Sequence, residues 1–321
     1  MVNPAVFLDY SSLDQQDLDV TPLQQVLPNL TLYAATSPVD VVERAIDAEI
    51  VIVNKVTLDQ AILSQLPKLK LILVSATGVN NVDLQAAQAQ GIVVCNCQGY
   101  GTTSVAQHTL ALMFALATNL VRYHNAVQQG RWQQAEQFCF LDYPIIELSG
   151  KTLGILGYGE LGQEVARLAR ALGMNVLVGQ LPHRPAHADR LSLEELLPQV
   201  DILSLHCPLT EQTQNLIGEA ELKQMKATAF LINAARGGIV NEAALADALR
   251  NHIIAGAATD VLSQEPPKQG NVLLDTTLPN FIITPHSAWG SVQARQRIVE
   301  QLAENAAAFL SQQPIRQVNA S

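Results

Sequence analysis

Three residues in the second half of the chain carry the side chains needed to reduce a keto acid. They are Arg236, Glu265 and His286, separated by 29 and 21 positions. An arginine binds a carboxylate through two parallel hydrogen bonds and polarises a neighbouring carbonyl. A histidine donates a proton to the developing alkoxide, and a carboxylate beside it fixes its tautomer and raises its pKa. We therefore expect the three residues to converge in one site for hydride transfer to a small 2-keto acid.

A glycine-rich turn earlier in the chain would supply the nucleotide half of such a site. Gly157-Tyr158-Gly159-Glu160-Leu161-Gly162 follows an apolar run and precedes a helical pattern at residues 163–172. The first glycine permits a tight turn, the second lets a pyrophosphate approach the backbone, and the third lets helix and strand pack closely. The helix N-terminus adds unpaired N–H groups for the phosphates. This context predicts dinucleotide binding.

The residue after the next strand bears on the choice of nicotinamide cofactor. An acidic residue there binds the ribose 2′-hydroxyl of NAD, whereas this chain has Gln180, followed by His183 and Arg184. Without that carboxylate a 2′-phosphate is not repelled, and Arg184 could pair with it. The sequence predicts NADPH or NADH as the cofactor, with a slight preference for NADPH. The alternative is that Arg184 is a solvated loop residue.

These residues need a scaffold, and the hydrophobic pattern predicts an open α/β fold. Short β-branched runs alternate with helical patterns, and the later runs are almost continuously apolar, which is typical of parallel sheets covered on both faces. We predict two doubly wound, Rossmann-like domains. Ligands of such sheets bind beyond the carboxyl ends of the strands, where distant residues can meet. The predicted strands are 5–8, 30–34, 50–54, 69–74, 92–95, 152–156, 175–178, 201–205, 229–233, 254–258 and 281–284.

Two long helices and one irregular segment complete the predicted organisation. One helix is expected over Thr103–Gln129, with Gly130 as its stop, and another over Ser291–Leu310. The segment Arg131–Gly150 lies outside either predicted sheet, and we expect it to be an interface arm. Its aromatic residues include Trp132, Phe138, Phe140 and Tyr143.

Composition and charge argue against several other classes of function. The chain has 321 residues, of which 48% are hydrophobic and 15% charged, enough apolar material for two cores. A net charge of −10 opposes binding to nucleic acid or to an anionic membrane surface. The four cysteines (Cys95, Cys97, Cys139 and Cys207) are too few for a disulfide scaffold and lack the spacing of a metal site, so no metal is expected. The N-terminus lacks a signal-peptide pattern, so we expect a cytoplasmic protein.

Five motifs give the chain a resemblance to the D-isomer-specific 2-hydroxyacid dehydrogenases along essentially its whole length. They are GYGELG (157–162), HCPLTEQTQNLI (206–217), INAARGGIVNEAAL (232–245), AATDVLSQEPP (257–267) and TPHSAW (284–289). Within that family the chain looks most like the bacterial glycerate dehydrogenases, also termed hydroxypyruvate reductases. The resemblance implies reduction of hydroxypyruvate, and also of glyoxylate, to the D-hydroxy acid.

The resemblance also implies roles for individual residues. Arg236 would bind substrate, and His286 would act as acid/base with Glu265 as its partner. Asp260 would contact the nicotinamide end of the cofactor. The turn that would hold the substrate carboxylate through its backbone consists of Ala76, Thr77, Gly78 and Val79. Further residues expected at the cofactor are His206, Cys207, Pro208, Ala234 and Ala235.

The same resemblance implies a domain organisation. A flavodoxin-like substrate domain, which would act as a lid, is expected at residues 1–100 and 288–321. A dinucleotide-binding domain is expected to be inserted at residues 101–287. The resemblance further implies a homodimer, with the aromatic segment around Trp132 serving the interface.

Several alternatives remain open at this stage. Trp289 could wall the substrate pocket or be a core aromatic residue. His108 is interpreted as a core or capping residue, and His206 as a strand-end residue placed by its backbone rather than as an acid/base. Gln107 stands where the family often has Glu, and no interpretation follows from it.

The same residues help to distinguish this activity from other functions that occur on the same fold. D-lactate or phosphoglycerate specificity is possible within the family, although the segment after Leu310 is too short for the regulatory domain of many phosphoglycerate enzymes. Formate dehydrogenases have an amide where this chain has Glu265. An oxidoreductase of alcohols would leave Arg236 without a carboxylate to bind. A nucleotide-sensing corepressor can share the fold, but it has no need of Arg236, Glu265 and His286 together.

Overall fold

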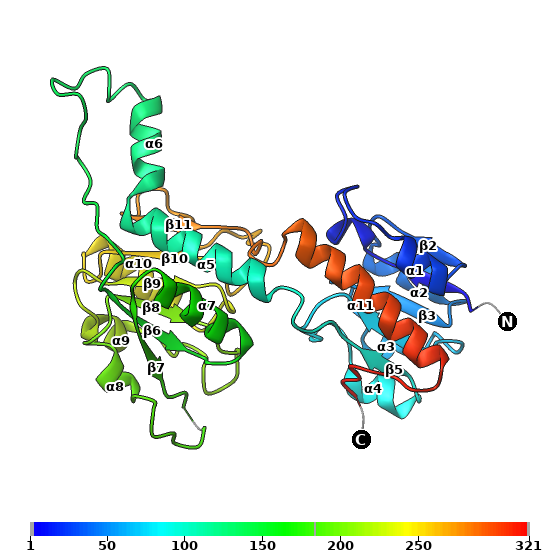
Figure 1. Cartoon of the computed structure of the whole chain (residues 1–321). Helices are drawn as coiled ribbons and strands as arrows, with labels where there is room; N and C mark the ends of the chain where they lie inside the picture. The colour runs from blue at the N-terminus through cyan, green and yellow to red at the C-terminus, as the bar shows by residue number, and fades with distance from the viewer. Residues whose placement is uncertain (1–2, 183, 320–321) are drawn as a thin grey trace. The chain divides into compact units, whose positions relative to one another are not determined.

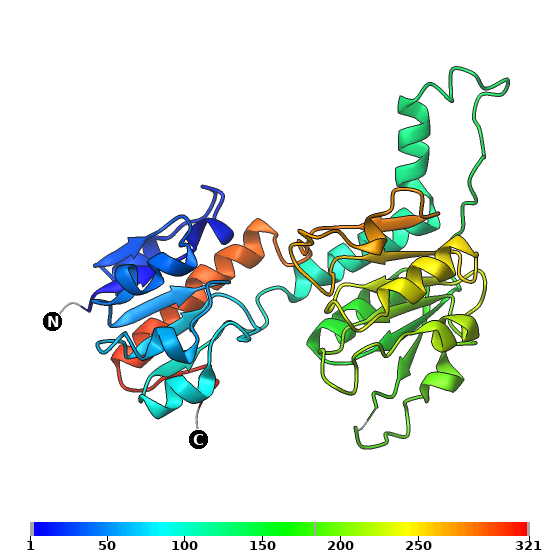
Figure 2. The ribbon, with the colours of Figure 1, turned by 180° about the vertical axis from the view of Figure 1, so that it is seen from behind.

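Two parallel sheets form the framework of the chain, one in each of two units (Figures 1 and 2). The computed structural model describes residues 3–182 and 184–319. Unit 1 comprises Met1–Gly101 and Gly290–Ser321, and unit 2 comprises Thr102–Trp289. The predicted fold class, two doubly wound α/β domains with parallel sheets, is confirmed.

Unit 1 holds a five-stranded sheet in the order β2-β1-β3-β4-β5, the order of flavodoxin-like folds. Its strands are β1 (Ala5–Phe7), β2 (Leu30–Leu32), β3 (Ile50–Val53), β4 (Leu71–Val74) and β5 (Val93–Cys95). Its helices are α1 (Thr21–Val26), α2 (Val41–Ala45), α3 (Gln60–Leu63), α4 (Leu84–Ala89) and α11 (Val292–Leu310), with short 3-10 turns η1 (Tyr10–Ser12) and η2 (Pro38–Asp40).

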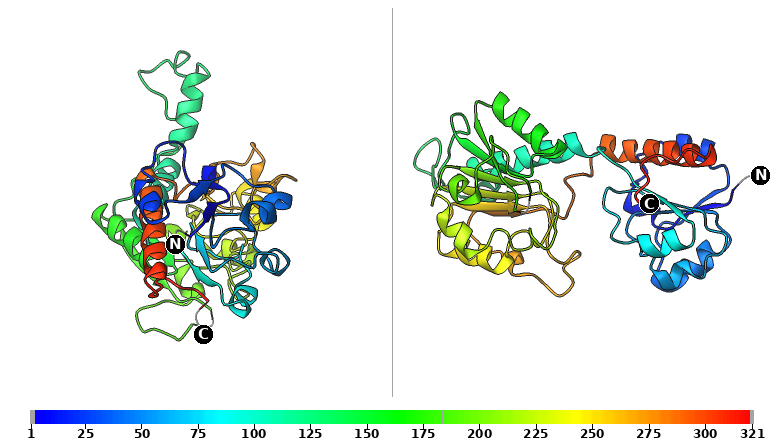
Figure 3. Two further views of the ribbon diagram at one scale, coloured as in Figure 1. Left: turned by 90° about the vertical axis from the view of Figure 1, so that its right-hand side faces the viewer. Right: turned by 90° about the horizontal axis from the view of Figure 1, so that it is seen from below.

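Both faces of this sheet are covered, which explains the continuous apolar runs of β3 and β4. Val51, Val53 and Ile72 share one buried cluster with residues of α2, α3 and α4. The helix α11 packs against α1 and β4 (Figure 3). It begins at Val292 after the N-cap Ser291, whose hydroxyl accepts the N–H of Ala294.

Unit 2 holds a six-stranded parallel sheet in the order β11-β10-β9-β8-β6-β7. Its strands are β6 (Thr152–Leu156), β7 (Asn175–Gly179), β8 (Ile202–Leu205), β9 (Phe230–Asn233), β10 (Gly256–Thr259) and β11 (Phe281–Ile283). Its helices are α5 (Thr102–Ala117), α6 (Leu120–Gln128), α7 (Glu160–Ala171), α8 (Leu193–Leu196), α9 (Glu219–Gln224) and α10 (Glu242–Arg250), with the 3-10 turn η3 (Val272–Leu274).

Side-chain alternation along the strands divides the core of unit 2 into two layers. Phe230 and Ile232 pack with α5 and α7 on one face, whereas Leu231 between them packs with α9 and α10 on the other. Every strand at the centre of the sheet is therefore buried on both sides. This arrangement leaves the carboxyl ends of the strands as the edge at which polar residues gather.

The single helix predicted over Thr103–Gln129 is wrong, because the chain forms two helices there. α5 ends at Ala117 and α6 begins at Leu120, and Asn119 between them adopts a left-handed conformation with φ of 51°. Its side-chain amide donates to the carbonyl of Pro144. Asparagine tolerates this conformation better than most residues, and a contact distant in sequence stabilises the bend.

No single described helix is long and apolar enough to cross a membrane; α5 and α6 reach that length and composition only as a pair bent by 60°.

The segment after the bend projects away from the sheet of unit 2 as an arm, defined here as residues 120–147 (Figure 1). The arm is tied together by its own contacts. Arg131 pairs with Asp142 at 2.7 Å, and the indole N–H of Trp132 donates to the carbonyl of Phe138. Large apolar side chains on the arm remain exposed, including Phe138 at 88% and Leu141 at 76%.

Candidate active site

The three catalytic candidates follow three strands that are neighbours in the sheet of unit 2. Arg236 follows β9, Glu265 follows β10 and His286 follows β11. Parallel strands bring their carboxyl ends to one edge, so residues far apart in sequence emerge side by side.

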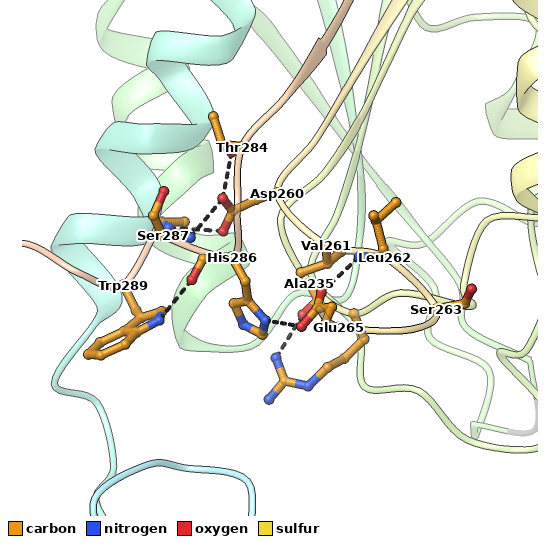
Figure 4. A network of polar contacts seen from close by, with 12 residues as sticks. Ala235, Asp260, Val261, Leu262, Ser263, Glu265, Thr284, His286, Ser287 and Trp289 are labelled. Atoms are coloured by element: carbon orange, nitrogen blue, oxygen red, sulfur yellow. Dashed lines mark hydrogen bonds and ion pairs between the residues drawn. The ribbon is translucent and has the colours of Figure 1, made fainter. Parts of the chain in front are cut away.

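His286 and Glu265 are in direct contact (Figure 4). The Nδ1 atom of His286 lies 2.6 Å from Oε2 of Glu265, and the other carboxylate oxygen, Oε1, accepts the backbone N–H of Leu262 at 2.8 Å. Because the carboxylate accepts at Nδ1, the hydrogen of the neutral ring belongs there and Nε2 is left for a reacting group. About one third of each side chain is exposed, which leaves the pair accessible.

The backbone around His286 is held in an unusual conformation by Asp260. His286 has a φ of 52°, and its N–H donates to the carbonyl of Asp260 at 2.7 Å. The buried carboxyl of Asp260 accepts the N–H groups of Ser287 and Ala288, both at 2.9 Å. The indole N–H of Trp289 donates to the carbonyl of His286. Asp260 and Trp289 therefore both contact the turn that carries His286, defined here as residues 284–288 and termed the catalytic turn.

The loop of Arg236 packs closely against the loop that carries Glu265. A Cβ atom at Gly237 would lie 1.8 Å from the carbonyl oxygen of Leu262, so only glycine permits this approach. Arg236 is exposed, and its Nη1 donates to the carbonyl of Ala235 at 2.7 Å. The structure thus places Arg236 on the loop adjoining the His286–Glu265 pair.

The glycine loop at residues 157–162 lies between β6 and α7, where the strand order reverses between β6 and β8. Gly157 has a φ of 97°, and a Cβ there would lie 2.5 Å from the backbone of His206. At Gly159, the N-cap of α7, no described atom lies within 4 Å of the Cβ position. The backbone is thus packed where glycine is required and open where a pyrophosphate would approach, so these residues fit a dinucleotide.

Among the residues that the structure describes, two buried side-chain polar atoms have no hydrogen-bond partner, and both belong to residues at strand ends beside this loop. They are Oε1 of Gln180 after β7 and Nδ1 of His206 after β8. The amide nitrogen of Gln180 donates to the carbonyls of its own loop at Leu181, Arg184 and Pro185. Such orphaned atoms are expected where a ligand completes the site. Arg184 is exposed, and His183 lies outside the described residues.

His206 is unsuited to donate protons. Its Nε2 lies 2.9 Å from the hydroxyl of Ser204, and desolvation lowers the pKa of His206 to about 4. The ring is therefore neutral near neutral pH. Burial also raises the pKa of the neighbouring Cys207 thiol to about 11, so this sulfur is not a thiolate.

The remaining predicted residues fall in two places. Ala234 and Ala235 are buried after β9, and the carbonyl of Pro208 accepts the hydroxyl of Thr213. The Ala76–Val79 turn follows β4 in unit 1, where the carbonyl of Thr77 accepts the side-chain amide of Asn96 at 2.8 Å. A role for this turn in substrate binding stays a prediction. Within the described ranges, no three His, Cys, Asp or Glu side chains are grouped to hold a metal ion.

Two residues in this part of the site were not identified as functional from the sequence. His108 on α5 lies 3.0 Å from the hydroxyl of Thr284, which in turn donates to Asp260. Ser104, one turn earlier on α5, donates to the carbonyl of Ala288. The spacing of Ser104 and His108 places them on one face of a helix, but their partners are 176 or more positions away.

An open parallel sheet with a glycine loop at its switch point and a paired histidine at neighbouring strand ends defines a nicotinamide-dependent oxidoreductase. The model of the NAD-binding domain of D-isomer specific 2-hydroxyacid dehydrogenases matches residues 110–288. The chain belongs to this family, as its motifs indicated, and is a nicotinamide-dependent D-2-hydroxyacid dehydrogenase.

Individual relatives agree with this assignment over nearly the whole chain. The glycerate dehydrogenase of Methylorubrum extorquens is 47% identical over 96% of this chain and 98% of its own length. The hydroxypyruvate reductase of Blautia hydrogenotrophica is 37% identical over 98% of this chain and 99% of its own. The crystal structure of the TT0316 protein from Thermus thermophilus superposes with a TM-score of 0.86 at 33% identity, covering 98% and 99% of the two chains.

Proposed function

We propose that this enzyme reduces hydroxypyruvate to D-glycerate, and glyoxylate to glycolate, with a nicotinamide cofactor. The observation that carries the proposal is the 2.6 Å contact between His286 and Glu265 beside the loop of Arg236. Its similarity to a glycerate dehydrogenase and a hydroxypyruvate reductase along nearly their full lengths supports the substrate class.

Each of the three residues has a defined task in this reaction. Arg236 binds the substrate carboxylate and orients the keto group. His286 donates the proton on Nε2 to the oxygen that becomes the hydroxyl, and in the reverse direction removes it. Glu265 holds the ring through Nδ1 and so keeps Nε2 directed at the substrate. The nicotinamide group supplies the hydride when the cofactor is bound.

The cofactor would be held by the residues that surround the glycine loop. The backbone of 157–162 and the N-terminus of α7 would bind the pyrophosphate. Gln180 and Arg184 would border the adenosine ribose, and Asp260 would lie toward the nicotinamide. We propose that NADPH is accepted at least as well as NADH, because no carboxylate stands at position 180 to repel a 2′-phosphate.

We further propose that the chain forms a homodimer through its arm. The arm exposes Trp132, Phe138, Leu141 and Ile145, and the first three are 53%, 88% and 76% exposed. Apolar side chains gathered on a projecting segment mark a protein interface more often than a solvated surface.

The proposal is tested by steady-state reduction of hydroxypyruvate, glyoxylate and pyruvate with NADPH and NADH. We expect hydroxypyruvate to have the highest kcat/KM. The variant His286→Ala should lower kcat/KM by about 100-fold or more, the usual contribution of a general acid, and Glu265→Gln by about tenfold. Glu219→Gln, an exposed glutamate on α9 paired with Lys223, is the matched control and should retain full activity.

Two results would contradict the proposal. Binding of cofactor without turnover of any of these keto acids would favour a nucleotide sensor. A His286→Ala variant with wild-type kcat/KM would show that another group donates the proton.

A further inference from the structure

A second chain of polar contacts lies behind the catalytic turn and has no place in the mechanism above. Nε2 of His108 lies 3.0 Å from the hydroxyl oxygen of Thr284. That hydroxyl donates to Oδ1 of Asp260 at 2.5 Å (Figure 4). Nε2 of His108 is itself 3.6 Å from the same oxygen. The chain connects α5 to the turn that carries His286.

The direction of these hydrogen bonds can be worked out from the donors available. A threonine hydroxyl has one hydrogen, and the hydroxyl of Thr284 gives it to Asp260. The oxygen of Thr284 must therefore accept from His108, so Nε2 of His108 carries a hydrogen. The order of donation is His108 to Thr284 to Asp260.

Asp260 connects these hydrogen bonds to His286 through contacts with the backbone. Its carboxyl accepts the N–H groups of Ser287 and Ala288, which directly follow His286, and its carbonyl accepts the N–H of His286. The left-handed conformation of His286 costs a non-glycine residue free energy and persists only when neighbouring contacts impose it. A shift of Asp260 would therefore turn the imidazole away from Glu265.

The helix α5, from which His108 projects, is itself fixed by packing and by a second hydrogen bond to the turn. Most of its apolar side chains are buried against the sheet and α7. Ser104, one turn before His108, donates to the carbonyl of Ala288 at 2.7 Å. The same helix face thus holds both ends of the catalytic turn, at Thr284 and at Ala288.

We infer that His108 is a positioning residue for His286, acting through Thr284 and Asp260. The inference rests on the proposed function for its effect on catalysis. His108 touches neither Glu265 nor the imidazole of His286 in this network; its effect is to keep the turn in the conformation that the His286–Glu265 contact requires.

The first test compares variants of His108 that remove or keep the hydrogen-bond donor. His108→Leu removes it, whereas the amide nitrogen of His108→Gln lies the same number of bonds from Cβ as Nε2 of histidine. Loss of one such hydrogen bond should lower kcat on hydroxypyruvate about fivefold to tenfold, with KM for the cofactor changed less than about twofold. The Gln variant should recover most of the loss. Gln107→Leu, at an exposed position on the same helix, is the matched control.

A double-mutant cycle tests the route through Thr284. Thr284→Val keeps the shape of the side chain and removes the hydroxyl. If His108 acts through that hydroxyl, adding His108→Leu to Thr284→Val should change kcat by less than about twofold. Wild-type kcat in His108→Leu would overturn the inference. Additive losses in the double variant, or equal losses in the Leu and Gln variants, would do the same.

A measurement that needs no turnover separates this inference from the proposed function. Hydrogen exchange is followed by mass spectrometry in a peptide that contains Ser287 and Ala288, whose N–H groups Asp260 accepts. His108→Leu and Thr284→Val should speed exchange there about fivefold, and Gln107→Leu should not. Inactive wild type with this pattern would refute the function and uphold the positioning role. Unchanged exchange in both variants would overturn the positioning role whatever the activity.

Discussion

At the scale of single residues, the two histidines that follow strands in unit 2 have opposite environments. His286 is one third exposed and has a carboxylate at Nδ1. The backbone of His206 packs against Gly157, its Nε2 lies 2.9 Å from the hydroxyl of Ser204, and desolvation lowers its pKa to about 4. Desolvation keeps the ring of His206 neutral, whereas Nε2 of His286 is left for a reacting group, which is why His286 is our proposed proton donor.

His206, whose ring nitrogen Nδ1 is buried, should make stability depend on pH. Between its unfolded pKa of about 6.5 and its folded pKa of about 4, the unfolded chain binds a proton that the native protein does not. Stability is therefore lost as the pH falls through this window, by up to about 3 kcal/mol in total and about 2 kcal/mol between pH 7 and pH 5. Urea unfolding at the two pH values measures the loss.

The variant His206→Asn cannot take up this proton, so its stability should fall less than that of the wild type over the same interval. His124→Asn, at an exposed position on α6, serves as the control and should follow the wild type. An unchanged pH dependence in His206→Asn would assign the loss to the carboxyl groups.

Gln180 is the residue at which cofactor preference should be easiest to reverse. In Gln180→Asp a carboxylate would accept the ribose hydroxyls of NADH and repel the 2′-phosphate of NADPH. We expect the ratio of kcat/KM for NADPH to that for NADH to fall by about tenfold or more. Gln199→Asp, an exposed change of the same kind in unit 2, should leave the ratio unchanged. A ratio unaffected by Gln180→Asp would place the discrimination elsewhere.

At the scale of elements, the bend between α5 and α6 depends on Asn119. Asn119→Ala places a β-carbon in the left-handed conformation and removes the hydrogen bond to Pro144, at a combined cost of about 2 kcal/mol. Asn119→Gly tolerates the left-handed conformation and loses only the side-chain hydrogen bonds, to Pro144 and from Arg122, so it should cost about half as much. The measurement is the rate of hydrogen exchange or proteolysis within residues 119–147.

Asn125→Ala is a matched change at an exposed position of α6 and should be neutral or slightly stabilising, since alanine favours helix. Equal losses in the Ala and Gly variants of Asn119 would mean that the backbone conformation is not strained there.

The same bend shows where prediction from sequence reaches its limit. The strands could be predicted because burial on both faces makes them continuously apolar, as in Ile50–Val53 and Phe230–Asn233. Glu265 and His286 could be expected to meet because both follow strands of one parallel sheet. The break at Asn119 and the contact of His108 with Thr284 could not be predicted, since their partners lie 25 and 176 positions away and leave no periodic signal.

At the scale of the whole molecule, each unit has its own buried core, and the arm is a part of unit 2 that touches that core near its end, where Ile146 packs against it. The arm leaves six large apolar side chains exposed, and four of them, Trp132, Phe138, Leu141 and Ile145, lie beyond α6. A chain with a net charge of −10 resists non-specific association, so a dimer requires a specific apolar surface to form. The arm is the segment of the described chain that we expect to provide it.

Replacing arm residues with aspartate should therefore separate the subunits. In the double variant Phe138→Asp/Leu141→Asp, two carboxylates from each copy would have to be buried in the interface, at a cost of several kcal/mol. We expect light scattering during gel filtration to give a dimer for the wild type and a monomer of about half its mass for the variant. Val39→Asp changes an equally exposed apolar residue of unit 1 and should leave the dimer intact.

The fluorescence of Trp132 should report the same dissociation, because its emission shifts to longer wavelength when the subunits separate and its indole is exposed to water. A wild-type monomer at micromolar concentration, or a variant that remains dimeric, would show that the exposed side chains of the arm serve another purpose.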